Sequence, residues 1–197
     1  MAALSASFLV ALSCSTTIPP ADYYVLGSQQ ASPRSNPAST LPYTLSVAHF
    51  ESAETFLRKS IVWQTDENQL GYYSYQRWAE TPAEMFSYRL YQRAHESGLF
   101  RQVVWGLSTG EADLIVKGKI TSFEELDTSE GWYGKVQVEA VLLKSDGAIL
   151  WSGLVGDTQP AAEKSVKAAV DAITKATEVT LTKILSSIEQ TLGKQSQ

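Results

Sequence analysis

Cysteine, histidine and clustered positive charge are scarce in this chain of 197 residues. Its one cysteine, Cys14, cannot form a disulfide within the chain, and a cysteine-rich zinc site is excluded for the same reason. The two histidines, His49 and His95, have no third histidine and no cysteine or glutamate partner at ligand spacing, so we expect no metal. The sixteen Lys and Arg residues form no run and the formal net charge is −5, which argues against a nucleic-acid partner.

Motifs that carry enzyme chemistry are also weak or missing. Residues 106–110, Gly-Leu-Ser-Thr-Gly, match the G-x-S-x-G pattern of a hydrolase nucleophile, but that serine needs a helix after it and a histidine downstream. Residues 111–120 instead continue as a strand and no histidine follows His95, so we predict a hairpin loop here. No glycine-rich phosphate loop and no dinucleotide fingerprint is present. We therefore expect no catalytic residues and no cofactor.

Four carboxylates, Glu124, Glu125, Asp127 and Glu130, cluster near the end of one predicted strand. Paired carboxylates can carry out acid–base chemistry or bind Ca²⁺. Their spacing fits no EF-hand loop, however, and acidic residues at a hairpin tip are usually solvated. We expect a solvent-exposed tip rather than a metal site.

The beginning of the chain has the features of a lipoprotein signal. Residues 2–12 form an apolar run that is too short to span a bilayer, and small residues then lead into Cys14. This arrangement is similar to a bacterial lipobox, in which the peptide is cut before the cysteine and the sulfur carries a diacylglycerol. It has Ala11 where the usual pattern has Leu, and no Lys or Arg precedes Arg34. The alternative interpretation is a buried N-terminal strand with an idle thiol.

The domain organisation follows from this signal. We expect a signal peptide at residues 1–13, a lipid-anchor tether at 14–22, one domain at 23–192 and a disordered tail at 193–197. A length of 197 residues with 44% hydrophobic residues fits a single globular domain. The tether spans at most about 28 Å when extended, so the folded body would lie close to the lipid surface.

A central helix is predicted to begin at Pro82 and to end before Gly98. Thr81 and Glu84 form a capping box, in which each side chain can bond the other's backbone amide, and proline suits the first helical position. Glycine after the helix can adopt the left-handed conformation that ends it. The apolar stripe of this helix consists of Phe86, Leu90 and Ala94.

Most of the remaining chain has the alternating pattern of β-strands. Three long segments, 113–126, 133–143 and 148–155, are separated by tight-turn signals and are predicted to form an antiparallel meander. The shorter predicted strands are residues 22–26, 43–50, 60–64, 70–76 and 100–105. Strands that alternate with helices indicate a mixed α/β domain.

A second helix is predicted over residues 160–192, with apolar residues at spacings of three and four. Such a helix extends about 50 Å, whereas a globular body of this size is about 40 Å across. The last two turns would overhang the sheet. We therefore expect Leu185, Ile188 and Leu192 to pack on another chain or on the N-terminal segment.

Aromatic residues are concentrated around one predicted strand. Tyr72, Tyr73, Tyr75, Trp78 and Trp132 could line a groove for an apolar ligand or form a partner surface. Tyrosine and tryptophan in strands also commonly pack in the core, and the sequence leaves both interpretations open.

Several segments together resemble the ABC-type transport auxiliary lipoprotein family. They are Arg77-Trp78-Ala79-Glu80 with the helix after it, Leu-Arg-Lys-Ser-Ile-Val at 57–62, Tyr-Tyr-Val-Leu at 23–26, and the strand at 113–124. The resemblance covers nearly the whole chain after Cys14. It departs at 57–59, where the family often has Leu-Asp-Arg.

The resemblance implies a three-layer fold, a mixed sheet with helices packed against it, and no catalytic residues. It also implies an outer-membrane lipoprotein facing the periplasm, which serves a transport system for lipids or other hydrophobic molecules. The partners would be an ABC permease and ATPase and an MCE-type substrate-binding protein, and the terminal helix could support a homo-oligomer. The alternative is an envelope lipoprotein that itself binds an apolar ligand or an assembly factor.

Overall fold

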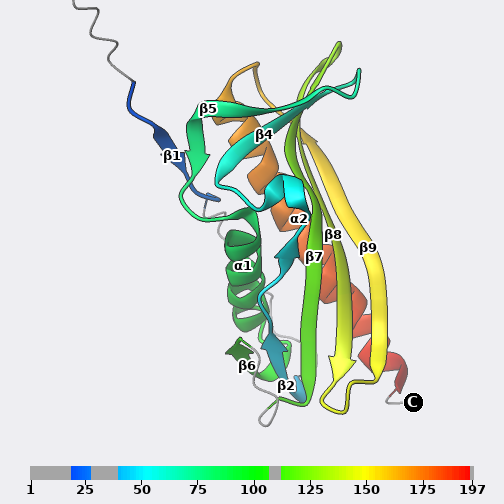
Figure 1. Ribbon diagram of the computed structural model, residues 1–197. Helices are drawn as coiled ribbons and strands as arrows, with labels where there is room; N and C mark the ends of the chain where they lie inside the picture. Colours follow the sequence, from blue (N-terminus) through cyan, green and yellow to red (C-terminus); the bar gives the residue numbers. More distant parts are fainter. Residues whose placement is uncertain (1–18, 28–39, 107–111, 196–197) are drawn as a thin grey trace, which may run out of the picture.

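The computed structural model describes residues 19–27, 40–106 and 112–195, and the fold is given for these residues (Figure 1). Cys14 and the predicted signal peptide lie outside the described residues. So does Ser108, the serine of the G-x-S-x-G match. The predictions made for Cys14 and the signal peptide therefore stay predictions. The hairpin loop predicted at residues 106–110 is wrong, because the strands before and after it, at 100–105 and 114–128, both run parallel to the strand at 41–47.

The longest strand, β7 (Leu114–Thr128), is the centre of the sheet (Figure 1). Along one edge it pairs antiparallel with β8 (Gly131–Lys144), which pairs antiparallel with β9 (Ile149–Pro160). The predicted meander is thus confirmed. Its last strand is longer than predicted, because pairing with β8 continues to Pro160.

The other edge of β7 is shared by three strands in succession, all parallel to it. β2 (Leu41–Val47) pairs near its start, β3 (Glu51–Ser52) near its middle and β4 (Ser60–Thr65) near its end. A short 3-10 turn, η1 (Glu54–Phe56), lies between β3 and β4. One long strand therefore organises three short ones.

Three further strands extend the sheet. β6 (Phe100–Trp105) pairs in parallel with β2, β5 (Leu70–Trp78) pairs antiparallel with β4, and β1 (Asp22–Tyr24) pairs in parallel with β5. Within the described residues, the nine strands form one curled mixed sheet. This agrees with the predicted mixed α/β fold.

The helix α1 (Pro82–Glu96) has the predicted ends. The Thr81 side chain accepts a hydrogen bond from the Glu84 amide (3.4 Å), and the Glu84 carboxylate accepts one from the Thr81 amide (2.9 Å). Gly98 follows the helix at φ 62°. The apolar stripe is completely buried against the sheet, with Phe86, Leu90 and Ala94 all 0% exposed.

The C-terminal helix α2 (Val166–Gln195) lies along β8 and β9 (Figure 1). It begins later than the predicted residue 160, because the chain up to Pro160 still belongs to β9. Its thirty residues extend about 45 Å. The fifteen residues of β7 extend about 50 Å, so the helix matches the sheet in length.

The prediction that the last turns of this helix overhang the sheet is therefore wrong. Ile188 and Leu192 are 0% and 1% exposed and belong to the core of this chain, and Leu185 is half-buried against that core. The prediction assumed a nearly spherical body, whereas the long strands make the body elongated. The helix also continues through residues 193–195, for which a disordered tail was predicted.

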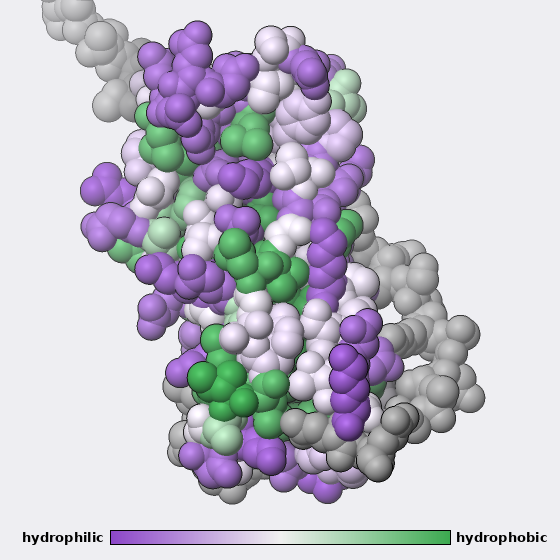
Figure 2. Space-filling view, turned by 90° about the vertical axis from the view of Figure 1, so that its right-hand side faces the viewer, coloured by the Kyte–Doolittle hydropathy of each residue, from purple (hydrophilic) through white to green (hydrophobic). Residues whose placement is uncertain are grey.

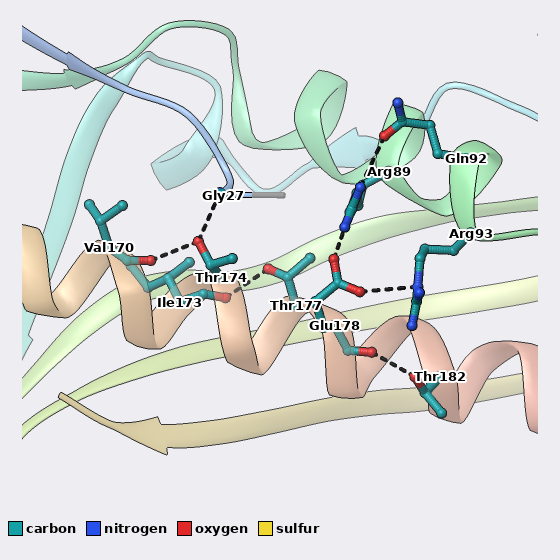
Figure 3. Close-up of polar contacts among 10 residues, drawn as sticks. All are labelled: Gly27, Arg89, Gln92, Arg93, Val170, Ile173, Thr174, Thr177, Glu178 and Thr182. Atoms are coloured by element: carbon teal, nitrogen blue, oxygen red, sulfur yellow. Dashed lines mark hydrogen bonds and ion pairs between the residues drawn. The ribbon is translucent and has the colours of Figure 1, made fainter. Parts of the chain in front are cut away.

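The first half of α2 is buried on two opposite sides. On the side of the sheet its backbone passes directly over Gly134 of β8, where an added Cβ would lie 2.2 Å from the Ile173 nitrogen. On the other side it contacts α1, and the Gly27 amide donates to Thr174 Oγ1 at 3.3 Å (Figure 3). The meander, α2, and α1 with the segment after β1 thus form three layers.

Candidate functional site

An exposed group of aromatic rings lies where α1 meets the end of β6. We call it the aromatic surface; its members are His49, Tyr88, Tyr91, His95 and Trp105. Trp105 is central, with ring centroids 4.6 Å from His49, 5.6 Å from Tyr88 and 5.7 Å from Tyr91. His95 stacks on Tyr91 at 6.2 Å. Tyr88 and Trp105 remain 50% and 38% exposed, so the rings are held in place and still reach solvent.

Two features of the sequence place these rings, namely a repeat along α1 and the register between β2 and β6. Tyr88, Tyr91 and His95 recur at spacings of three and four along α1, away from its buried stripe. Parallel pairing of β2 with β6 sets Val47 opposite Trp105, and this brings His49 beside the indole. The helical repeat is a signal in the sequence that could have identified these rings. The strand register was not visible.

Two hollows flank Tyr88. The first has a volume of about 330 Å³ and is lined by His49, Lys59, Glu80, Glu84, Tyr88 and Trp105. The second, of about 280 Å³, is lined by Val25, Leu26, Ala79, Glu80, Met85, Tyr88, Arg89 and Gln92. Hydrogen bonds from the Thr81 side chain and backbone hold the pKa of Glu84 below its ordinary value, so the part of the first hollow that Glu84 lines stays anionic. Mixed charge around exposed rings suits contact with another molecule.

The Arg77–Glu80 segment lies next to this surface, at the end of β5. Trp78 is fully buried, and its ring centroid lies 5.3 Å from that of Phe123 in a T-shaped contact. The Ala79 amide donates to the Tyr24 carbonyl at 2.8 Å, which joins β1 to the start of α1. The glutamate that ends the segment lines both hollows. The segment therefore supports the aromatic surface from within.

A buried ion cluster fixes α1, the helix that carries three of the rings. Glu178 of α2 accepts a hydrogen bond from Arg89 Nε at 2.6 Å and forms an ion pair with Arg93 Nε at 3.1 Å (Figure 3). Both arginines belong to α1. Because the two contacts lie one helical turn apart, they resist both sliding and rotation of α1 on α2.

The aromatic residues predicted from the sequence have different fates. Tyr72 and Tyr75 on β5 are 44% and 39% exposed, so their role as a surface stays a prediction. The Tyr73 side chain instead reaches a buried carboxylate of β7, because its hydroxyl donates to Glu125 at 2.9 Å. Trp132 is half-buried at the start of β8. Of the predicted partner surface on α2, Ile188 and Leu192 are core residues, as described above.

The prediction of a solvated acidic tip is wrong for two of its four carboxylates. Glu124 and Glu125 are only 3% and 1% exposed, and their strand is not at a free edge there, since β4 and β8 pair with β7 on its two sides. Burial raises the pKa of Glu125 to about 7, although the Tyr73 hydroxyl opposes the rise. Burial also raises the pKa of Glu124, against the attraction of the Lys135 ammonium at 3.8 Å.

These carboxylates do not converge on one point. Glu124 and Glu125 are consecutive in a strand and point to opposite faces of the sheet. In the described part of the chain, no three His, Cys, Asp or Glu side chains are placed to hold a metal ion. The residues that the structure describes also include no helix long and apolar enough to cross a membrane.

A second exposed apolar region follows β9, whose one partner among the described strands is β8. Figure 2 views this side and shows apolar groups separated by polar ones. Ile149 and Leu154 are its exposed large apolar residues. The Lys183 ammonium bonds the Gly156 carbonyl at 2.7 Å and the Asp157 carboxylate at 2.8 Å, so α2 reaches around part of the open edge. We call Ile149 and Leu154 the β9 pair.

Comparison with known proteins identifies the family. A family model described as "ABC-type transport auxiliary lipoprotein component" matches residues 24–185. The chain belongs to this family. The matched range includes every ring of the aromatic surface and most of α2. No curated protein sequence matches it.

Solved structures show the same fold at low sequence identity. Protein XCC0632 from Xanthomonas campestris, assigned to the family DUF330, superposes with a TM-score of 0.72 at 20% identity, covering 82% of this chain and 92% of that one. An uncharacterised protein gives a TM-score of 0.68 at 13% identity, covering 86% and 99%. A hypothetical protein from Chlamydia trachomatis gives 0.52 at 9% identity, covering 76% and 96%.

Proposed function

We propose that this auxiliary lipoprotein is a non-catalytic docking component, anchored in the outer membrane through acylated Cys14 and facing the periplasm. It would attach an ABC transporter and its MCE-type substrate-binding protein to that membrane, for transport of lipids or other hydrophobic compounds. The match of residues 24–185 to the transport auxiliary family carries this proposal. The lipobox-like sequence around Cys14 supports the anchor.

The aromatic surface is the proposed contact with the transporter. Tyrosine and tryptophan dominate the binding energy of many protein interfaces, because they bury a large area with few rotatable bonds. Trp105 is already held by three neighbouring rings, so its binding would cost little side-chain entropy. The Glu178 cluster holds the helix beneath it in one position.

A pull-down tests the contact. We would express the full-length chain in its native host, solubilise the envelope after mild cross-linking and measure recovery of the transporter subunits. Tyr88→Ala and Trp105→Ala together should reduce recovery at least about tenfold, since each such residue can contribute over 1 kcal/mol. The control is the pair Ile149→Ala and Leu154→Ala, which removes exposed apolar side chains from the β9 pair. Equal recovery in both variants would contradict the proposal.

A second candidate function is direct binding of an apolar ligand. It is favoured by the apolar part of the second hollow, which Val25, Leu26, Ala79 and Met85 supply. Native mass spectrometry of the mature protein separates the two functions. Co-purified lipid that is lost on Met85→Lys would support ligand binding, whereas a lipid-free protein that still recovers the transporter supports docking.

A further inference from the structure

We infer that one particular end of the folded body rests on the membrane surface, and that its contact is with zwitterionic lipid headgroups. This end, which we call the hairpin end, consists of β1, the β4–β5 hairpin and the β7–β8 turn. The inference rests on the proposed acylation of Cys14. It adds an orientation and a lipid contact that the proposed anchor alone does not supply.

The chain between the acylated cysteine and the folded body is short. Asp22, the first residue of β1, follows Cys14 by eight positions, so the connection spans at most about 28 Å. β1 is itself fixed to the body, because Tyr23 pairs with Arg77 of β5. The Gly27 amide adds a bond to Thr174 of α2 (Figure 3). The lipid is therefore tethered to a fixed point on the body.

The fixed point at β1 lies in the same half of the body as the hairpin end. β4 pairs with the last residues of β7, so the β4–β5 hairpin lies level with the β7–β8 turn (Figure 1). β1 lies in the same half of the molecule (Figure 1). The opposite end carries the β8–β9 turn and the end of α2, and β7 places it about 50 Å away. A tether of about 28 Å is shorter than this distance, so it favours an orientation with the hairpin end, rather than the far end, towards the lipid.

The side chains exposed at the hairpin end suit contact with a membrane surface. It exposes one aromatic residue of β1 and three large residues of β5; these are Tyr23, Leu70, Tyr72 and Tyr75. Tyrosine prefers the membrane–water interface, because its ring can enter the headgroup layer while its hydroxyl stays hydrated. A body tilted onto β1 and β5 would bring these residues to the headgroups first.

Charge decides which lipids fit. The β4–β5 turn carries Asp66 and Glu67, and both are exposed. The amide of Ser129 in the neighbouring β7–β8 turn donates to the Asp66 carboxylate at 3.3 Å, which keeps the two turns together. An acidic tip of this kind is repelled by an anionic surface and tolerated by a neutral one. Zwitterionic headgroups are therefore the expected contact.

The single cysteine makes the orientation testable. In the acylated protein the Cys14 sulfur is occupied, so an introduced cysteine would be the only free thiol. We would place cysteine at Tyr72 or Tyr75 in the hairpin end, and at Ile149 or Leu154 in the β9 pair as exposed controls. Each full-length lipidated variant would carry a small fluorophore on this thiol. It would then be reconstituted into phosphatidylcholine vesicles containing headgroup-nitroxide lipid.

The nitroxide should quench the labels at residues 72 and 75 and leave the label at 149 unquenched. Replacing phosphatidylcholine by phosphatidylglycerol should reduce the quenching at 72 and 75. Variants that float with the vesicles but show equal quenching at all four positions, or stronger quenching at 149, would overturn the inference while leaving the anchor intact. Protein that does not float with the vesicles would overturn the proposed anchor, and the inference with it.

Discussion

Glu178 of α2 and Arg89 of α1 form an ion pair between the two helices at 2.6 Å, with side chains only 11% and 12% exposed. Removing the carboxylate by Glu178→Ala leaves Arg89 and Arg93 charged and largely buried. Loss of one partner from a buried pair typically costs about 3–5 kcal/mol. We expect the free energy of unfolding in urea to fall by about that amount.

The matched control lies on the same helix. Lys167 and Asp171 form an exposed ion pair at 3.0 Å, one turn apart on α2. Because exposed pairs of this spacing contribute about 0.3–0.5 kcal/mol, Asp171→Ala should change stability by less than about 1 kcal/mol. Similar losses in the two variants would mean that burial does not strengthen the Glu178 cluster.

Glu125 should make stability depend on pH. Its pKa is raised by burial from 4.5 to about 7, so the protonated form is favoured by folding. The stability that protonated Glu125 contributes is therefore fully present below about pH 4.5 and is lost as the pH rises through 7. In Glu125→Gln this loss should disappear, and the variant should be the more stable protein at pH 8, by up to about 3 kcal/mol.

Urea unfolding at pH values from 5 to 8 would measure this effect. Glutamine keeps an oxygen that can accept the hydrogen bond of the Tyr73 hydroxyl, so the test isolates the charge. Glu130→Gln, which removes a carboxylate from an exposed position in the same turn region, is the matched control. A Glu125→Gln profile that matches the parent would show that Glu125 titrates normally.

Gly134 should tolerate no side chain. A Cβ there would lie 2.2 Å from the Ile173 backbone nitrogen, and a helix backbone cannot move aside locally as a flexible side chain can. We expect Gly134→Ala to cost at least about 2 kcal/mol through overpacking. Gly193→Ala is the control, because an added Cβ there meets nothing within 4 Å beyond its chain neighbours and the adjacent backbone of its own helix; alanine should there stabilise the helix by up to about 1 kcal/mol. Thermal melts of both variants would measure the difference.

The end of α2 should stabilise the single chain rather than an assembly. Leu192→Ala removes a side chain that is 1% exposed, and such truncations cost about 2–5 kcal/mol. Gln190→Ala, on the exposed side of the same turn, should cost less than about 0.5 kcal/mol. Unfolding at several protein concentrations checks the interpretation. A loss for Leu192→Ala that grows on dilution would instead indicate a subunit contact.

Local signals in the sequence were sufficient for several elements. The capping box at Thr81 and Glu84 and the glycine at 98 define α1, because helix ends depend on neighbouring residues alone. The meander followed from alternation and turn residues, which are likewise local. Family resemblance was also visible from short segments spread along the chain.

Features that depend on strand order could not be predicted. Glu124 and Glu125 resemble a solvated tip until β4 is known to pair with their strand. The meeting of His49 with Trp105 requires the parallel register of β2 and β6, which no local pattern encodes. The burial of Leu192 depended on the length of β7–β9, and an estimate based on a spherical body missed it.

The position of β7 also has a consequence for how the protein folds. β2, β3 and β4 all precede β7 in the chain and all pair with it in parallel, and β6 joins the sheet through β2. Before β7 has been synthesised, β2 can pair with β6 and β4 with β5, but the strand that joins these two pairs into one sheet is missing. Contacts so distant in sequence slow folding. The N-terminal half should therefore remain a chaperone client until the second half arrives, and truncation within β7 should abolish structure in strands that it leaves untouched.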